Sequence, residues 1–232
     1  MNAAEAILAE VAAELSWLTP GPVFIGGTTI GLFLDELGRD QLRPTKDVDC
    51  IAPSVVTPLT WFALERDLQH RGWSPDRDGP ICRYRSPRGH VVDLLGARAE
   101  AQGFSATWLE AAAAHTQKHV LGGTTVVATP AVEYIVACKI EAFCDRGAAD
   151  PLASNDFEDL VALLDGCASL ESAIAGAEQD VRAFTVGWFR ALRADGELMS
   201  AADGHLPRGG DFEGRRRRLR ERLQRLAALA LR

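Results

Sequence analysis

Segments with the pattern of β-strands occur only in the first 129 residues of this 232-residue chain, and this division constrains the possible fold more than any other feature. Short apolar or alternating runs bounded by glycine, proline and polar residues are typical of strands. Such runs lie at residues 23–25, 47–52, 81–85, 90–95 and 124–128. From Pro130 onward only helical spacing is found. The sequence therefore predicts a mixed α/β domain over residues 1–129 and a helical domain over residues 130–232.

The helices are predicted from apolar residues three and four positions apart, and from proline or glycine at their ends. The first domain should contain helices at residues 3–18, 28–37, 58–71 and 108–115, with a loop at residues 39–46. The second should contain helices at residues 130–146, 155–166 and 212–231, helical segments within 170–195, and a loop at residues 202–214. The expected fold class is α+β, a mixed sheet with flanking helices followed by an all-helical domain.

The composition excludes several classes of protein. Hydrophobic residues make up 47% of the chain and charged residues 25%, which is ordinary for a globular protein that can build a core without disulfides. No apolar run is long enough for a transmembrane helix. The five cysteines are an odd number without a CxxC pair, and most have apolar neighbours. We therefore expect buried thiols and a cytoplasmic protein that does not enter membranes.

The charge is distributed unevenly along the chain. A net charge of -7 argues against a protein that coats nucleic acid by bulk charge. Near the C-terminus, however, arginines are concentrated at positions 215, 216, 217, 218, 220, 222 and 225. Two interpretations stay open: this segment binds an RNA backbone, or it is an amphipathic helix that faces solvent or a protein partner.

Asp47 and Asp49 are the first candidates for a chemical role. They begin the expected strand at residues 47–52, and alternate residues of a strand point to the same face. Two carboxylates on one face can bind one or two divalent cations. The DxD pattern alone also occurs by chance at solvated loop ends, so it needs support from other residues.

Asp93 supplies such support, because it interrupts the apolar strand Val91–Leu95. An unpaired carboxylate is costly in such a place unless it binds a metal or a cation. If the strands of Asp47 and Asp93 are neighbours, three carboxylates meet, and hard oxygen ligands suit Mg²⁺ bound to a nucleoside triphosphate. The alternative is that Asp93 pairs with Arg83 or Arg85.

Gly26 and Gly27 follow the apolar strand Val23–Ile25 and precede an expected helix. Paired glycines at such a junction allow a phosphate to approach the backbone, although a simple tight turn explains them as well. Neither the GxxxxGK[ST] pattern nor GxGxxG is present, which disfavours P-loop enzymes and dinucleotide-binding dehydrogenases.

Lys139 lies within the apolar stripe of the expected helix at residues 130–146. A lysine on a buried face must either extend its head into water or meet an anion, and a triphosphate is one such anion. Asp156 begins the next helix at the edge of its apolar face. The helix dipole alone accounts for an acidic first turn, but Asp156 could also pair with Lys139 or position a substrate hydroxyl.

These segments together resemble the DNA polymerase β-like nucleotidyltransferase superfamily. The similarity lies in Gly26–Thr28 and in the run Arg43–Asp49. Downstream, Lys139–Phe143 and Asn155–Leu160 are similar to the abortive-infection AbiEii type, which includes nucleotidyltransferase toxins of bacterial toxin–antitoxin systems. The resemblance covers about residues 20–165. It implies a nucleotidyltransferase fold, with the helical domain completing an active-site cleft.

The resemblance implies a Mg²⁺-dependent transfer of a nucleotide, often a pyrimidine, from a nucleoside triphosphate to an RNA acceptor such as the tRNA 3′ end. Asp47, Asp49 and Asp93 would bind metal, Lys139 would contact the triphosphate, and Asp156 would match an essential acidic residue. The implied nucleotide-binding residues are Gly26, Gly27, Thr28, Arg43, Thr45 and Lys46. A cognate antitoxin is an expected partner.

Two further points follow from the same residues. Phosphorylation of Thr45 would add negative charge beside Asp47 and should repel a triphosphate.

Two rival functions stay open: a nucleotidyltransferase that modifies a small molecule such as an aminoglycoside, and an inactive family member that acts as a binding partner.

Overall fold

The computed structural model describes residues 2–39, 42–45, 47–98, 102 and 106–230. It divides into two compact units, one of residues 1–29 and 44–131, the other of residues 30–43 and 132–232. The sequence placed the segment 30–43 in the first domain. In the structure this segment belongs to the second unit, because Ile30 and Leu34 lie in the helical core.

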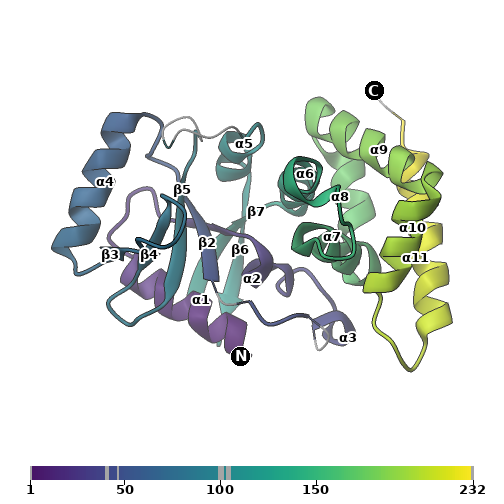
Figure 1. The fold of residues 1–232 in the computed structure, drawn as a ribbon, viewed down its shortest axis with the longest axis horizontal. Helices are drawn as coiled ribbons and strands as arrows, with labels where there is room; N and C mark the ends of the chain where they lie inside the picture. The colour runs from purple at the N-terminus through teal and green to yellow at the C-terminus, as the bar shows by residue number, and fades with distance from the viewer. Residues whose placement is uncertain (1, 40–41, 46, 99–101, 103–105, 231–232) are drawn as a thin grey trace. The chain divides into compact units, whose positions relative to one another are not determined.

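The first unit is built on a seven-stranded mixed sheet (Figure 1). Its strands are β1 (Val23–Ile25), β2 (Asp47–Ala52), β3 (Ser74–Pro75), β4 (Arg83–Arg85), β5 (Val91–Gly96), β6 (Thr116–Leu121) and β7 (Thr125–Pro130). They are arranged in the order β3-β4-β5-β2-β1-β7-β6. Each strand expected from the sequence is present, and the α+β class is confirmed.

β6 is a strand that the sequence analysis missed. It forms a hairpin with β7 across Gly122 and Gly123, both of which have a positive φ. Its side chains alternate between exposed and half-buried, but most of them are polar, so this edge strand shows no alternation of apolar and polar residues. The two glycines flanked by alternating residues are a hairpin signal that could have revealed it.

Among the described residues, the helices α1 (Ala3–Glu14), α4 (Pro58–His70) and α5 (Leu109–Ala114) belong wholly to the first unit. α1 begins with a capping box at Asn2 and packs against β2, β6 and β7. α4 begins with Thr57 as its N-cap and Pro58 in its first turn. The expected helix to residue 18 was too long, since α1 ends at Glu14.

The continuous helix expected over residues 28–37 is wrong. The segment instead forms two short helices, α2 (Gly27–Ile30) and α3 (Glu36–Arg39). Asp35 separates them, because its carboxylate accepts a hydrogen bond from the Gly38 N–H at 2.8 Å and so caps a new helix. The Asp35 N–H also donates to the Gly166 carbonyl, which ties this segment to the second unit.

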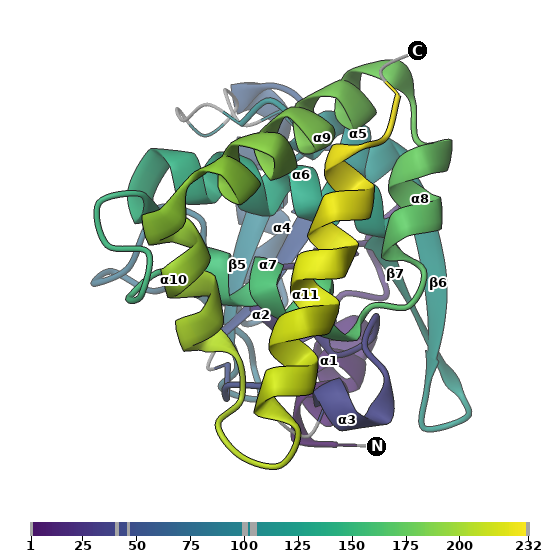
Figure 2. The same ribbon diagram turned by 90° about the vertical axis from the view of Figure 1, so that its right-hand side faces the viewer.

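The second unit contains helices packed around one hydrophobic core (Figure 2). They are α6 (Val132–Ala142), α7 (Asn155–Gly166), α8 (Leu170–Gly176), α9 (Gln179–Ala194), α10 (Gly196–His205) and α11 (Phe212–Ala227), and a π-helical turn at Phe143–Gly147 follows α6. The helices expected at 130–146 and 155–166 are confirmed in position. The loop expected at 202–214 is shorter, because α10, capped by Asp195, continues to His205.

The C-terminal arginines hold α11 against its own unit. Leu219, Leu223 and Leu226 of α11 are buried in the core. Around them, arginines form ion pairs with acidic residues of the same unit: Arg215 with Asp165, Arg216 and Arg220 with Asp203, Arg218 with Asp211, and Arg222 and Arg225 with Glu171. The helix is amphipathic, as one interpretation held, but most of its arginines face intramolecular carboxylates.

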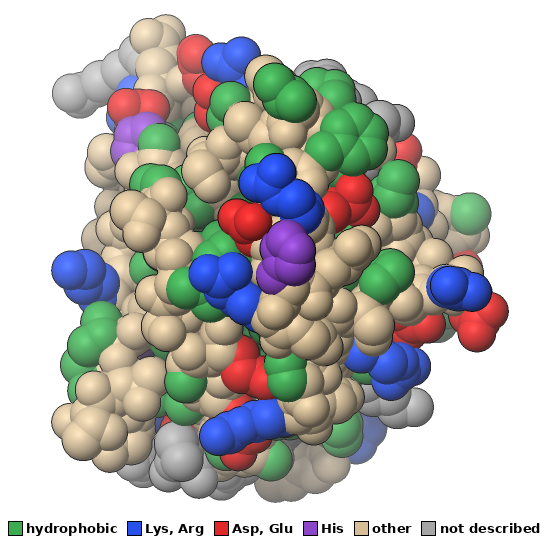
Figure 3. Space-filling view, turned by 90° about the vertical axis from the view of Figure 1, so that its left-hand side faces the viewer, with side chains coloured by type: hydrophobic (Ala, Val, Ile, Leu, Met, Phe, Trp, Pro, Cys, Tyr) green, Lys and Arg blue, Asp and Glu red, His purple; other side chains and the backbone are tan. Residues whose placement is uncertain are grey.

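The outer surface of the first unit around α4 carries exposed apolar residues, including Leu59 and Phe62. Figure 3 shows apolar and charged side chains interspersed on this face. Within the described residues, none of the helices is both long and apolar enough to cross a membrane. All five cysteines are free thiols: Cys50, Cys82 and Cys167 are buried as expected, Cys138 is half-buried and Cys144 is exposed.

Candidate functional site

The sheet register places the candidate metal ligands in one row. β2 and β5 are parallel neighbours in which Asp49 is the partner of Asp93, and Asp47 lies two residues before Asp49. β4 continues the row on the other side of β5, where Arg83 is the partner of Asp93. The condition set from the sequence, that the strands of Asp47 and Asp93 be neighbours, is therefore met.

The glycine turn contacts the same row from β1. Ile25 pairs with Asp49, so Gly26 follows directly beside it. Gly26 has a φ of 84°, and a Cβ at this position would overlap the Asp49 carboxylate. Only glycine adopts this positive φ readily and also leaves space for the carboxylate. The buried Thr28 hydroxyl donates to the Asp47 carbonyl at 2.6 Å, so the turn and the aspartate strand are bonded together.

Arg83 binds two of the three aspartates. Its Nε donates to Asp93 Oδ1 at 2.8 Å and its Nη2 to Asp93 Oδ2 at 2.8 Å. The same Nη2 donates to Asp47 Oδ2 at 2.9 Å. The hydrogen bond and the charge of Asp93 raise the pKa of Arg83 above its usual value. The alternative in which Asp93 pairs with Arg83 is thus the observed arrangement.

The buried thiols of Cys82 and Cys50 have raised pKa values, to which the nearby aspartates contribute. Burial raises the pKa of Cys82 to about 11, with Asp93 adding to the shift. Burial likewise raises the pKa of Cys50, and the charges of Asp49 and Asp93 contribute in the same direction. Burial is the larger cause of both shifts, and the aspartate charges add to it.

The residues fit Mg²⁺ in part. Carboxylate oxygens are the donors that Mg²⁺ prefers, and Asp47 and Asp49 supply them from one face of β2. Asp93 does not fit as a third ligand in this arrangement, because both of its oxygens accept hydrogen bonds from Arg83. Within the described residues, no three His, Cys, Asp or Glu side chains are grouped so that they could hold a metal together.

The second unit contains a separate cluster of charged residues around Lys139. This residue is 9% exposed, and its Nζ lies 2.9 Å from Asp156 Oδ1 and 2.6 Å from Asp159 Oδ2. Asp156 and Asp159 are also buried, at one face of the first turn of α7. The predicted pairing of Lys139 with Asp156 is confirmed, and the alternative in which Lys139 extends its head into water is wrong.

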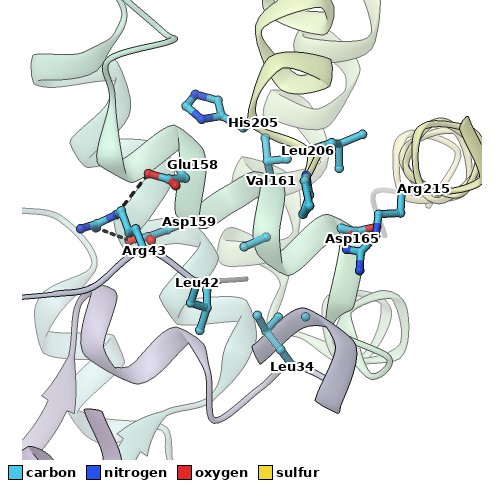
Figure 4. Close-up of a pocket in the computed structure, with 13 residues that line it drawn as sticks. Leu34, Leu42, Arg43, Glu158, Asp159, Val161, Asp165, His205, Leu206 and Arg215 are labelled. Atoms are coloured by element: carbon cyan, nitrogen blue, oxygen red, sulfur yellow. Dashed lines mark hydrogen bonds and ion pairs between the residues drawn. The ribbon is translucent and has the colours of Figure 1, made fainter. Parts of the chain in front are cut away.

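Two arginines complete the cluster. Arg146, in the π-helical turn after α6, donates from Nε to Asp156 Oδ2 at 2.9 Å. Arg43 lies 3.3 Å from Glu158 Oε2 and 3.5 Å from Asp159 Oδ2 (Figure 4). Cations and carboxylates therefore alternate through the cluster, which meets the requirement that buried charges be paired.

The pKa shifts in the cluster reflect this pairing. Burial lowers the pKa of Lys139, but the charges of Asp159 and Asp156 outweigh it, so the pKa is raised above the usual value. Burial raises the pKa of Asp156, but Lys139 and Arg146 outweigh it, so the pKa is lowered. Lys139 and Asp156 are therefore both charged at neutral pH.

A pocket beside this cluster is lined by Arg43, Glu158, Asp159 and His205 together with apolar residues of α7 and the neighbouring segments (Figure 4). Its volume is about 40 Å³. Binding sites for small molecules have volumes of roughly 300–1,000 Å³. The pocket has room for water but not for a nucleotide.

The structure thus groups the predicted residues into two sets. Gly26, Gly27, Thr28, Asp47, Asp49 and Asp93 come together in the first unit, and Arg43, Lys139 and Asp156 in the second. Thr45 is half-buried just before β2, and Lys46 lies outside the described residues.

Arg146 and Asp159 were not predicted as site residues, and Arg83 was predicted only as an alternative partner of Asp93. Asp159 is three residues after Asp156 on one helix, so spacing could have revealed it. Arg146 is two helical turns after Lys139, which is a weaker signal. The role of Arg83 depends on the register of a hairpin, which the sequence does not specify.

Comparisons with known proteins add no assignment: no protein-family model matches this chain, and no curated protein matches its sequence.

Proposed function

We propose that this chain is a Mg²⁺-dependent nucleotidyltransferase that transfers a nucleotide from a nucleoside triphosphate to an RNA hydroxyl, with the tRNA 3′ end as the acceptor. The observation that carries the proposal is the joining of the Gly26–Thr28 turn to the Asp47–Asp49 strand. Gly26 admits the Asp49 carboxylate, and Thr28 binds the Asp47 backbone. These segments are far apart in sequence, and a simple tight turn does not require either contact.

In the proposed reaction the acceptor hydroxyl loses its proton to solvent and its oxygen forms a bond to the α-phosphorus. The bond from that phosphorus to the oxygen it shares with the β-phosphate breaks, and pyrophosphate leaves. Asp47 and Asp49 would hold Mg²⁺, which when bound neutralises phosphate charge. The work of the chain is to position the reactants and to supply charge in fixed places. Within the second unit, Asp159 and Asp156 keep the Lys139 ammonium charged and oriented.

The assay that tests the proposal is transfer of label from each α-labelled nucleoside triphosphate to total RNA with Mg²⁺. Asp47→Asn removes a proposed ligand, and Asp67→Asn on the surface of α4 is the matched control. We expect labelled tRNA with the unaltered chain and with Asp67→Asn, and none with Asp47→Asn.

The same assay separates the rival functions. Label on an aminoglycoside, with none on RNA, supports modification of a small molecule, which the net charge of -7 would favour for a cationic acceptor. Absence of label on both kinds of acceptor supports an inactive binding partner.

A toxin role makes a separate prediction. Expression of the unaltered chain in bacteria should arrest growth, and expression of Asp47→Asn should not. An antitoxin is then the partner that relieves the arrest.

A further inference from the structure

Arg83 is the side chain that occupies the place of a cation beside the aspartates. Its guanidinium donates to both oxygens of Asp93, at 2.8 Å each. Parallel hydrogen bonds of this kind are the strongest contact between an arginine and a carboxylate. Asp93 is therefore committed to Arg83 in this structure.

The same guanidinium joins two strands. Its Nη2 also donates to Asp47 Oδ2 at 2.9 Å, so one arginine fixes a carboxylate on β5 and another on β2. Lysine offers a single point charge and cannot make this set of contacts from one planar group.

The surrounding chain makes room for Arg83. A Cβ at Gly79 would lie 2.6 Å from Arg83 Cδ, so glycine at this position leaves space for the Arg83 side chain. The loop before β4 is closed by hydrogen bonds from Gly79 N to the Asp76 carbonyl and from Arg83 N to the Pro80 carbonyl. Arg83 is thus a half-buried, supported residue and differs from a surface arginine that meets a carboxylate by chance.

We infer that Arg83 is a positioning residue of the proposed site: it withdraws Asp93 from the metal-ligand set and orients the Asp47 carboxylate, so that Asp47 and Asp49 hold the cation. The inference rests on the proposed function. It differs from the expectation that Asp93 binds metal directly.

The test is a titration of the full chain with Mn²⁺ alone, followed by the electron paramagnetic resonance signal of the free ion. Asp49→Asn should weaken binding by about tenfold or more, the range for loss of a metal-site group. Asp93→Asn should weaken it by less than about fivefold, as for the loss of one screened charge.

The decisive comparison repeats Asp93→Asn in the Arg83→Gln background. Without Arg83, Asp93 can bind the ion, so Asp93→Asn should now weaken binding by about tenfold. If Arg83 had only a structural role, Asp93→Asn would weaken Mn²⁺ binding by the same factor with and without Arg83. Where Arg83→Gln does not fold, as judged by circular dichroism, Arg83→Lys replaces it, since lysine cannot hold both oxygens.

The results distinguish the positioning role of Arg83 from the proposed function. If Asp93→Asn weakens binding as much as Asp49→Asn in the unaltered background, Asp93 is a ligand and the inference is wrong, while the proposed function stands. A small effect of Asp93→Asn in both backgrounds also overturns it. Mn²⁺ binding that depends on neither Asp47 nor Asp49 contradicts the proposed function, and the inference fails with it.

Discussion

Replacing Lys139 by methionine should strongly destabilise the helical unit. The change keeps the length and apolar stem of the side chain but removes the charge between Asp156 and Asp159. These carboxylates are only 6% and 2% exposed. Removing one partner of a buried ion pair typically costs about 3–5 kcal/mol.

The contacts that Asp156 and Asp159 keep in Lys139→Met decide how much of this cost is lost from the free energy of unfolding. Asp156 keeps Arg146, whereas Asp159 keeps only the longer 3.5 Å contact with Arg43. We therefore expect the lower end, about 3 kcal/mol, most of it from Asp159. At roughly 2–4 °C per kcal/mol, the thermal transition should fall by at least about 6 °C. Adding Asp159→Asn to Lys139→Met should restore part of the loss, because it removes the unpaired charge.

The destabilisation should depend on pH with a defined sign. In the unaltered chain the pKa of Asp156 is lowered, so its contribution to stability is present above its unfolded pKa of about 3.9 and is lost as the pH falls further. In Lys139→Met the buried carboxylates should have raised pKa values. Acid then neutralises them, and the difference between the variant and the unaltered chain should shrink between about pH 7 and 4.5.

The assay is urea unfolding followed by far-ultraviolet circular dichroism, with Lys118→Met on the exposed edge strand β6 as the control. The control should change the free energy of unfolding by less than about 0.5 kcal/mol. A Lys139→Met effect equal to that of the control would refute the reasoning, as would a difference that grows in acid.

Three other changes test separate parts of the structure. Gly26→Ala and Gly89→Ala both introduce a side chain at a positive φ. Gly89→Ala should lose about 1–2 kcal/mol by urea unfolding. Gly26→Ala should lose more than Gly89→Ala and should alone abolish nucleotide transfer, because only there does a Cβ overlap Asp49. A thiol reagent at pH 8 should modify Cys144 rapidly, the half-buried Cys138 more slowly, and Cys50, Cys82 and Cys167 only after denaturation; fast modification of any of these last three would contradict the described burial. Deletion of α11 should unfold the helical unit, because its three buried leucines contribute about 1.5–3 kcal/mol each. The loss should be visible by circular dichroism, and an intact helical signal would show that α11 is not part of the core.

The sequence predicted those features that depend on local periodicity. Asp47 and Asp49 alternate with buried residues of β2, as the period of a strand requires. Lys139 falls within an apolar stripe, and this position indicated either a head extended into water or a buried cation that meets an anion. Both signals are contained in a few neighbouring residues.

Features that depend on distant packing were not predicted. The segment 30–43 joins the helical unit through contacts of Asp35 with Gly166 and of Arg43 with α7, which no local pattern encodes. Arg83 meets Asp93 only because the register of β4 and β5 places them opposite each other. β6 escaped detection because polar residues on an edge strand lack a clear alternation.

The most direct test of the central claim follows two labels through one reaction. With the α-phosphate labelled, the account predicts that label appears on the RNA acceptor. With the γ-phosphate labelled, it predicts that all label is released as pyrophosphate, and that Asp49→Asn abolishes both signals. Transfer of γ-label to the acceptor would show a phosphoryl transferase, and would contradict the assignment of Asp47 and Asp49 to nucleotidyl transfer.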